Sequence, residues 1–124
     1  YSLYTISGFD VGRREKLHLV IPVGLGATQG NPHKGKDLDD LVKTGGGLSA
    51  DSAKWPDWFL AGARAAQLAP TATNQQAFRL SMDEKERVSI KSGIGVMTGI
   101  DEGIVKYNFE VGAASKGKQN VTWK

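Results

Sequence analysis

The stretch that decides the fold is LAPTATNQQAF at residues 68–78, which joins two segments of different periodicity. Before it, residues 55–68 (WPDWFLAGARAAQL) have the composition and spacing of a helix. Pro56 suits the first helical turn, and Pro70 ends the helix because proline has no N–H to donate. After it, residues 77–82 (AFRLSM) alternate apolar and polar side chains, as a half-buried strand does. The stretch is therefore the connection between a helix and a strand.

The strand predicted after this connection is the first half of a hairpin. Phe78, Leu80 and Met82 share one face of the strand and are expected to pack on the core. Residues 83–86 form a charged turn, and residues 87–90 return as the second strand.

The remaining elements are predicted from apolar runs and helix-end signals. Residues 17–23 (LHLVIPV) form an apolar, β-branched run of strand length, and residues 120–123 suit a final short strand. Residues 37–43 predict a short helix and residues 99–113 a longer one, each with acidic side chains at its start. In the longer helix we expect one apolar stripe to face the core, formed by Ile100, Ile104, Tyr107 and Val111. The order strand, helix, helix, hairpin, helix, strand predicts an α+β fold.

Length and composition limit the class of protein. The 124 residues suffice for one ordinary domain, and the absence of Cys excludes disulfide scaffolds, cysteine-ligated metals and thiol nucleophiles. A reducing compartment is permitted, and we expect a cytoplasmic protein. No apolar run approaches the ~18 residues of a membrane span. The chain starts without Met or a signal-peptide pattern, so we interpret its start as a cut within a longer protein.

The charge is mildly basic, with a formal net charge of +3. Basic and acidic side chains are mixed along the chain, and only the tail with Lys116, Lys118 and Lys124 is locally basic. A nucleic-acid binder usually concentrates its charge on one face, so a solvated surface is the favoured interpretation. His18 and His33 have no carboxylate partner that the spacing identifies, which disfavours a metal site.

Polar side chains gather in the central stretch. Hydroxyl and amide groups share one turn there, from Thr71, Thr73, Asn74, Gln75 and Gln76. Such groups can bond a neutral polar heterocycle or a sugar without carrying charge. The alternative is that they satisfy the backbone of their own loop, and the residues by themselves leave both interpretations open.

Three segments resemble the FMN-dependent nitroreductase family. LAPTATNQQAF is similar to the "APSxxNxQPW" signature of that family. LHLVIPVGLG at residues 17–26, followed by HKGKDLDDLV at residues 33–42, resembles the late "lPvGy … K-x-R … leelv" stretch. GIDEGIVKYNFEVGA at residues 99–113 resembles the helix after the hairpin in a nitroreductase subfamily whose chains carry two half-copies.

The resemblance implies a nitroreductase-like α+β fold, of which this chain is the C-terminal half only. Residues 1–44 would be the tail of a first half-copy, the glycine-rich residues 45–54 a linker, and residues 55–124 the second half-copy. In that subfamily the two half-copies together mimic the usual homodimer, and FMN lies at the interface between the halves.

The resemblance also assigns candidate cofactor-binding residues. Six positions match residues that bind or frame the flavin in the family, namely Lys34, Lys36, Pro70, Thr71, Asn74 and Gln76. The two lysines match a late basic pair that helps to hold the FMN phosphate. The other four match the segment that reaches the flavin from the opposite half, with the glutamine positioning the loop. The family's early Arg segment has no counterpart here, and Ala77-Phe78 replaces its usual Pro-Trp.

The implied function is hydride transfer from NAD(P)H through FMN to a nitroaromatic or quinone-like acceptor, with no catalytic side chain required. The implied partners are the missing N-terminal half or a second copy of the chain, besides the small-molecule acceptor; no nucleic acid or membrane is expected. We expect weak or no FMN binding by the chain alone unless two copies associate. An exposed apolar face on the 55–68 helix would favour such a homodimer. The alternative is a non-catalytic interaction half that lost, or never had, its own flavin site.

Overall fold

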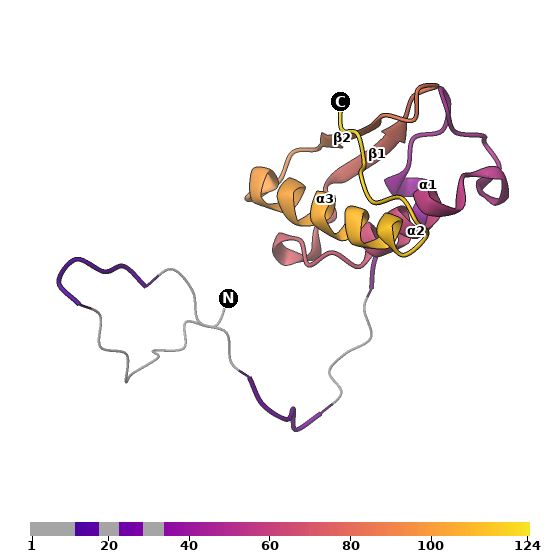
Figure 1. Cartoon of the computed structure of the whole chain (residues 1–124). Coiled ribbons are helices and arrows are strands. Elements are labelled where there is room, and N and C mark those ends of the chain that lie inside the picture. Colours follow the sequence, from indigo (N-terminus) through magenta and orange to yellow (C-terminus); the bar gives the residue numbers. More distant parts are fainter. Residues whose placement is uncertain (1–11, 18–22, 29–33) are drawn as a thin grey trace. The chain divides into compact units, whose positions relative to one another are not determined.

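The computed structural model describes residues 12–17, 23–28 and 34–124 (Figure 1). The chain divides into two compact units, Tyr1–Pro32 and His33–Lys124. The helices and strands of the described residues all belong to the second unit. His18, His33 and most of the strand expected at residues 17–23 lie outside the described residues.

The second unit combines helices with a small sheet, which confirms the α+β class. Its elements in chain order are α1 (Leu38–Leu41), a 3₁₀ turn (Ser52–Lys54), α2 (Asp57–Gln67), a second 3₁₀ turn (Ala72–Asn74), β1 (Phe78–Met82), β2 (Val88–Ser92) and α3 (Thr98–Ala114). The helix, the hairpin and the long helix predicted between residues 55 and 113 are confirmed. Figure 1 shows α2 and α3 lying side by side along one face of the hairpin.

The sheet is an antiparallel hairpin extended at each edge by a single residue. Leu80 of β1 is paired in parallel with Val42, and Val88 of β2 with Trp123. The backbone N–H of Lys43 donates to the carbonyl of Leu80 (2.7 Å). On the other edge, the backbone N–H of Val88 donates to the carbonyl of Thr122 (2.8 Å). This pairing explains why α1 is shorter than the predicted 37–43 helix, because the chain must become extended after Leu41. The final strand expected at residues 120–123 is reduced to this one bridge.

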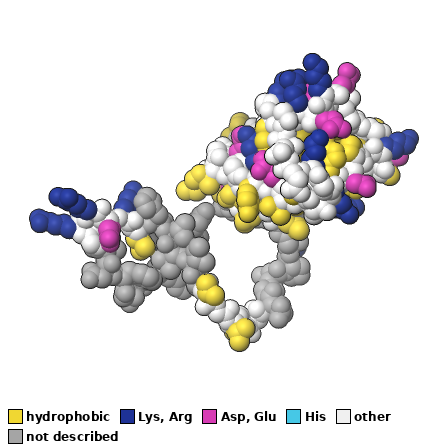
Figure 2. Space-filling model, viewed as in Figure 1, with side chains coloured by type: hydrophobic (Ala, Val, Ile, Leu, Met, Phe, Trp, Pro, Cys, Tyr) yellow, Lys and Arg dark blue, Asp and Glu magenta, His cyan; other side chains and the backbone are white. Residues whose placement is uncertain are grey.

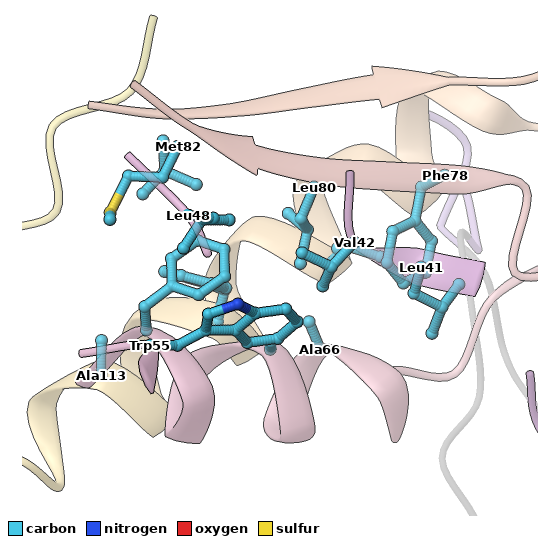
Figure 3. Close-up of a cluster of buried hydrophobic side chains, with 14 of the residues drawn as sticks. Leu41, Val42, Leu48, Trp55, Ala66, Phe78, Leu80, Met82 and Ala113 are labelled. Carbon is cyan, nitrogen blue, oxygen red and sulfur yellow. The ribbon is translucent and has the colours of Figure 1, made fainter. Parts of the chain in front are cut away.

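The core lies between the inner face of the hairpin and the two long helices. Phe78, Leu80 and Met82 are buried, as their alternation predicted. Figure 3 shows Leu80 and Met82 extending from β1 toward the side chains of other elements, Trp55 among them. The indole N–H of Trp55 donates to the carbonyl of Ser49 (2.8 Å), so this ring is buried with its polar atom bonded.

Helices α2 and α3 approach each other closely through glycine. A Cβ at Gly62 would lie 2.9 Å from atoms of the Phe109 ring, and a Cβ at Gly112 would lie 2.7 Å from the Cβ of Ala65. The rings of Phe59 and Phe109 meet edge to face with centroids 5.4 Å apart. Small residues on one helix therefore make room for aromatic rings on the other.

The predicted core stripe of α3 is wrong by a rotation of the helix. Ile100, Tyr107 and Val111 are 61%, 68% and 53% exposed, and Ile104 is only partly buried. The buried stripe is instead Asp101, Val105, Phe109 and Ala113. The helix carries two apolar stripes, and the one buried against α2 contains Phe109, whose ring lies against Gly62 of α2. The carboxylate within this stripe made it the weaker candidate in the sequence.

The prediction of an exposed apolar face on the 55–68 helix is also wrong. Phe59, Gly62, Ala63 and Ala66 of α2 are buried, and α3 covers them. Leu68, at the end of that helix, is exposed, but the other large exposed apolar side chains of this unit lie on α3 and the loop before it: Ile94, Val96, Met97, Ile100, Tyr107 and Val111. We call these six residues the α3 apolar surface. In Figure 2 hydrophobic side chains line the lower edge of the folded unit, where Figure 1 places α3 and, below it, the loop between α2 and β1.

The glycine-rich segment at residues 45–54 packs within the second unit. The backbone N–H of Gly47 donates to the carbonyl of Met82 (3.0 Å), and Leu48 is buried in the core. A Cβ at Gly47 would collide with the carbonyl oxygen of Asp83, so the segment lies directly against the hairpin turn. The half-copy boundaries remain a prediction, and the segment lies within the unit His33–Lys124.

The glycine contact between the helices generates a matched test. We expect Gly112→Ala to lower the free energy of unfolding by about 1–2 kcal/mol, because the new methyl has no space and overpacking outweighs the gain in helix propensity. Gly103→Ala on the same helix meets open space and should raise stability by about 0.5–1 kcal/mol. Urea denaturation of both variants checks the pair, and equal stability of the two would contradict the close packing.

Candidate functional site

The connection between α2 and β1 is organised around the side chain of Gln76. Its Nε2 donates to the carbonyl of Gln67 at the end of α2 (2.6 Å), and its Oε1 accepts from the backbone N–H of Lys36 (2.5 Å). Its backbone N–H donates to Oγ1 of Thr71 (3.0 Å). Gln76 is 1% exposed, so this amide is buried with both of its ends bonded. One side chain thus ties together three segments of the chain.

Both lysines of the predicted basic pair are joined to this connection. The Nδ2 of Asn74 donates to the carbonyl of Lys34 (2.5 Å), and the Nε2 of Gln67 donates to the carbonyl of Lys36 (2.8 Å). The ammonium of Lys36 donates to the carbonyl of Gln76 (3.0 Å). Residues that lie 40 positions apart in the sequence are therefore neighbours here.

The loop has an uncommon backbone conformation. Thr73, Asn74 and Gln76 have φ values of 51°, 53° and 43°, in the left-handed region. Asparagine tolerates this region, but a β-branched threonine does so rarely, and such residues cost about 1–3 kcal/mol each. The hydrogen bonds of Gln76 and Thr71 hold the loop in this shape.

Asp101 is a site residue that sequence reasoning missed. It is 6% exposed, in the first turn of α3. Its Oδ1 accepts from the backbone N–H of Ala72 (2.9 Å), and its Oδ2 accepts from Nε2 of Gln75 (2.7 Å). The carboxylate therefore fixes the outer end of the same loop to α3. The available signal was its spacing, because Asp101 stands four residues before Val105 on the stripe that is buried.

Gln75 links the loop to the segment before α3. Its Nε2 also donates to the carbonyl of Val96 (2.6 Å), and its Oε1 accepts from the backbone N–H of Val96 (3.2 Å). A Cβ at Gly95 would collide with this amide, so the glycine permits the close contact. The loop is consequently held at one end by Lys36 and at the other by Val96.

The predicted site residues divide into two groups by burial. Thr71 and Gln76 are buried and bonded within the loop, so they position it. The exposed members are Lys34, Lys36, Pro70 and Asn74. Together these offer two ammonium groups, an amide and an apolar ring to a ligand. Among residues 12–17, 23–28 and 34–124, no group of three or more His, Cys, Asp and Glu side chains is placed to hold a metal ion.

Two carboxylates near the hairpin have lowered pKa values. The pKa of Glu102 lies below its usual value, chiefly because the Lys106 ammonium bonds its carboxylate (2.7 Å) and also because the Ser92 hydroxyl donates to it (3.0 Å). The pKa of Asp83 is lowered chiefly by the backbone N–H of Arg87 (3.0 Å), which closes the hairpin turn. Both groups stabilise the fold in their ionised form.

Comparison with protein families identifies the relatives of this chain. Residues 6–113, which include both segments of the site, match the family described as "Putative TM nitroreductase". The chain belongs to this family. Membership in this nitroreductase family indicates an oxidoreductase, and it confirms the resemblance that the sequence suggested. Comparisons with curated proteins and with solved structures found no match.

For this nitroreductase-family chain, the site and the core are parts of the same unit. The loop at residues 70–76 leaves α2 and enters β1, and Asp101 begins α3. Helices in the described part of the chain are too short or too polar to cross a membrane.

Removal of the two amide side chains tests which one holds the loop. We expect Gln76→Gly to lower the free energy of unfolding by roughly 2–4 kcal/mol, since it removes a buried side chain and leaves two partly buried backbone groups unbonded. Asn74→Gly removes one exposed bond and should lower it by less than about 1 kcal/mol. Glycine suits the positive φ of both positions, so neither change adds backbone strain. Thermal unfolding compares the two, and similar losses would refute the central role of Gln76.

The lowered pKa of Glu102 predicts a pH effect. A carboxylate with a lowered pKa adds stability above its unfolded value of about 4.3 and loses it as the pH falls toward the folded value. We expect Glu102→Gln to lose less stability between pH 6 and pH 3 than the parent chain loses. Glu84→Gln, in the exposed hairpin turn, serves as the control. Urea midpoints at the two pH values measure the difference, and identical pH dependence for all three proteins would contradict it.

Proposed function

We propose that this chain is part of an FMN-dependent oxidoreductase that transfers hydride from NAD(P)H to a nitroaromatic or quinone-like acceptor. The observation that carries the proposal is that Lys34 and Lys36 are hydrogen-bonded to the loop at residues 70–76. Membership in the nitroreductase family supports the reaction class. The proposed flavin contacts are the exposed members of the site, with the buried Thr71 and Gln76 holding them in place.

The residues present suit a flavin mononucleotide in chemistry. A phosphate dianion favours nearby cations, which Lys34 and Lys36 supply at the exposed edge of the loop. The flavin ring carries carbonyl and N–H groups along one edge and an apolar surface, which Asn74 and Pro70 complement. The Nδ2 of Asn74 bonds the backbone of Lys34, so its Oδ1 is the amide atom left to accept from a ligand.

Bound FMN would supply the hydride chemistry, and the protein supplies the site around it. Lys34 and Lys36 would neutralise the phosphate and fix its position. The loop holds its shape before a ligand arrives, because Gln76 and Asp101 bond it from two sides. A rigid loop reduces the ordering cost of binding.

We propose that a second copy, or the N-terminal half of a longer protein, covers the α3 apolar surface. Val96, one of its six members, is bonded directly to Gln75 of the site loop. A partner on this surface would therefore stand beside the flavin. This position accords with the expectation that the cofactor lies between two halves. An uncovered apolar surface of this kind also favours self-association.

A second candidate is a non-catalytic half that serves only as a structural partner. The observation in its favour is that Gln76 and Thr71 use their polar atoms to bond their own loop. Under this alternative the polar side chains serve to hydrogen-bond the backbone of their own loop and bind no ligand.

Flavin binding separates the two candidates. The flavin function predicts that the chain quenches FMN fluorescence, increasingly so at protein concentrations where it self-associates. Lys34→Ala and Asn74→Gly should each weaken FMN binding about tenfold, because each removes a polar contact to the ligand. Lys85→Ala, in the exposed hairpin turn, should bind as the parent does. Circular dichroism confirms that the variants are folded.

The outcome that contradicts the flavin function is equally specific. FMN that binds no more tightly to the parent than to the Lys34→Ala, Asn74→Gly double variant would favour the structural half. In that case Asn74→Gly would change the stability of the fold and leave the affinity for FMN unchanged. NADPH oxidation with a nitroaromatic then becomes the test of the larger protein.

A further inference from the structure

Two cations face each other on the outer side of the hairpin. The strand register pairs Arg79 directly with Lys91, and the alternation of β1 puts Arg79 on the face away from the core. Directly opposed like charges on a sheet are destabilising. Both side chains are exposed, and neither forms an ion pair in the described residues. The sheet therefore maintains a repulsion that any neutral residue at either position would relieve.

A depression of about 440 Å³ lies beside this pair. Arg79 and Lys91 belong to its lining, and Lys36 is the third basic residue there. Ala77 and Phe78 also contribute to the lining. The rest of the lining comes from Asp40 and from the end of β2 with the loop after it, namely Ser92, Gly93 and Ile94. With one carboxylate among three cations, the formal charge of the lining is +2.

Neutral groups hold two of the cations in place. The Lys36 ammonium donates to the carbonyl of Gln76 (3.0 Å), and the Nε of Arg79 donates to the backbone carbonyl of Asp40 (3.3 Å). A carbonyl fixes a cation without cancelling its charge, whereas a carboxylate would cancel it. The Ser92 hydroxyl donates to Glu102, a carboxylate that is already paired with Lys106. Three positive groups therefore surround the depression with most of their charge free.

We propose that this depression binds a phosphate dianion, held by Lys36, Arg79 and Lys91. The charge of the lining matches a doubly charged group, and an arginine presents the forked N–H geometry that phosphate oxygens accept. A bound dianion would turn the repulsion between Arg79 and Lys91 into shared attraction. Gly93 leaves the rim of the depression free of a side chain.

The phosphate has two possible sources, which share this chemistry: free phosphate, or the phosphate of a nucleotide. The site includes Lys36 from the proposed flavin contacts, but it does not depend on the proposed function, because inorganic phosphate alone is enough to test it. Arg79 and Lys91 are the residues that the inference adds.

Thermal unfolding with inorganic phosphate tests the site, with chloride replaced at constant ionic strength. A ligand that binds the folded state raises the melting temperature. We expect phosphate to raise it for the parent chain, and Arg79→Gln or Lys91→Gln to remove more than half of that rise. Without phosphate, Lys91→Gln should melt no lower than the parent, because it relieves the cross-strand repulsion; Arg79→Gln relieves it too but also loses the bond to the Asp40 carbonyl. Lys85→Gln, away from the depression, should keep the full rise.

Melting temperatures measured with and without phosphate distinguish a residue that binds phosphate from one with a structural role. A structural role would lower the melting temperature of the variant without phosphate. An equal phosphate-dependent rise in the parent and both variants, or no rise in the parent, would overturn the proposal. Loss of stability by Lys91→Gln in the absence of phosphate would overturn it as well.

Amide chemical shifts identify the source. Shifts in the amides of residues 77–79 and 91–94 with inorganic phosphate and with FMN, but not with riboflavin, support a nucleotide phosphate. Shifts with inorganic phosphate alone support free phosphate. Unchanged amides in all three titrations would refute the site. Failure of FMN to bind, with phosphate shifts present, would refute the flavin function and leave this site standing.

Discussion

The buried amide of Gln76 is the interaction on which the arrangement of the site depends. It bonds the end of α2 and the backbone of Lys36, while the backbone N–H of the same residue donates to Oγ1 of Thr71. A glutamine can do this because its amide has a donor and an acceptor on one flat group. Loss of either bond would leave one end of the buried amide and a partly buried main-chain atom unbonded. The loop keeps its left-handed residues because this amide and Asp101 hold both of its ends.

A second constraint operates in the core, where α2 and α3 lie too close for ordinary side chains. Gly62 and Gly112 provide the space, and Phe109 occupies part of it. This closeness selects which face of α3 is buried. The face left outside carries the α3 apolar surface, next to the loop held by Gln75. The packing of α2 against α3 thus determines that the α3 apolar surface lies next to the site.

Elements with strong local signals could be predicted from the sequence. The ends of α2 follow from Pro56 and Pro70, and the inner face of β1 follows from strict alternation. The orientation of α3 could not be predicted, since it carries two apolar stripes and periodicity alone does not say which one meets a partner. Gln76 and Lys36 could be selected only through a family resemblance, because their contact joins distant parts of the chain. The role of Asp101 was hidden because a first-turn acid is already explained by the helix dipole.

The long separation between the contacts of the site has a consequence for how the molecule forms. The hairpin closes over a few residues, and α2 and α3 form from local contacts. The bonds between Lys36 and Gln76 instead close a loop of 40 residues, which gains its energy only after the ends have met. We therefore expect the site to assemble late in folding and to open early when stability falls. Amide protons of the loop should exchange through this local opening while those of the hairpin and the two long helices are still protected.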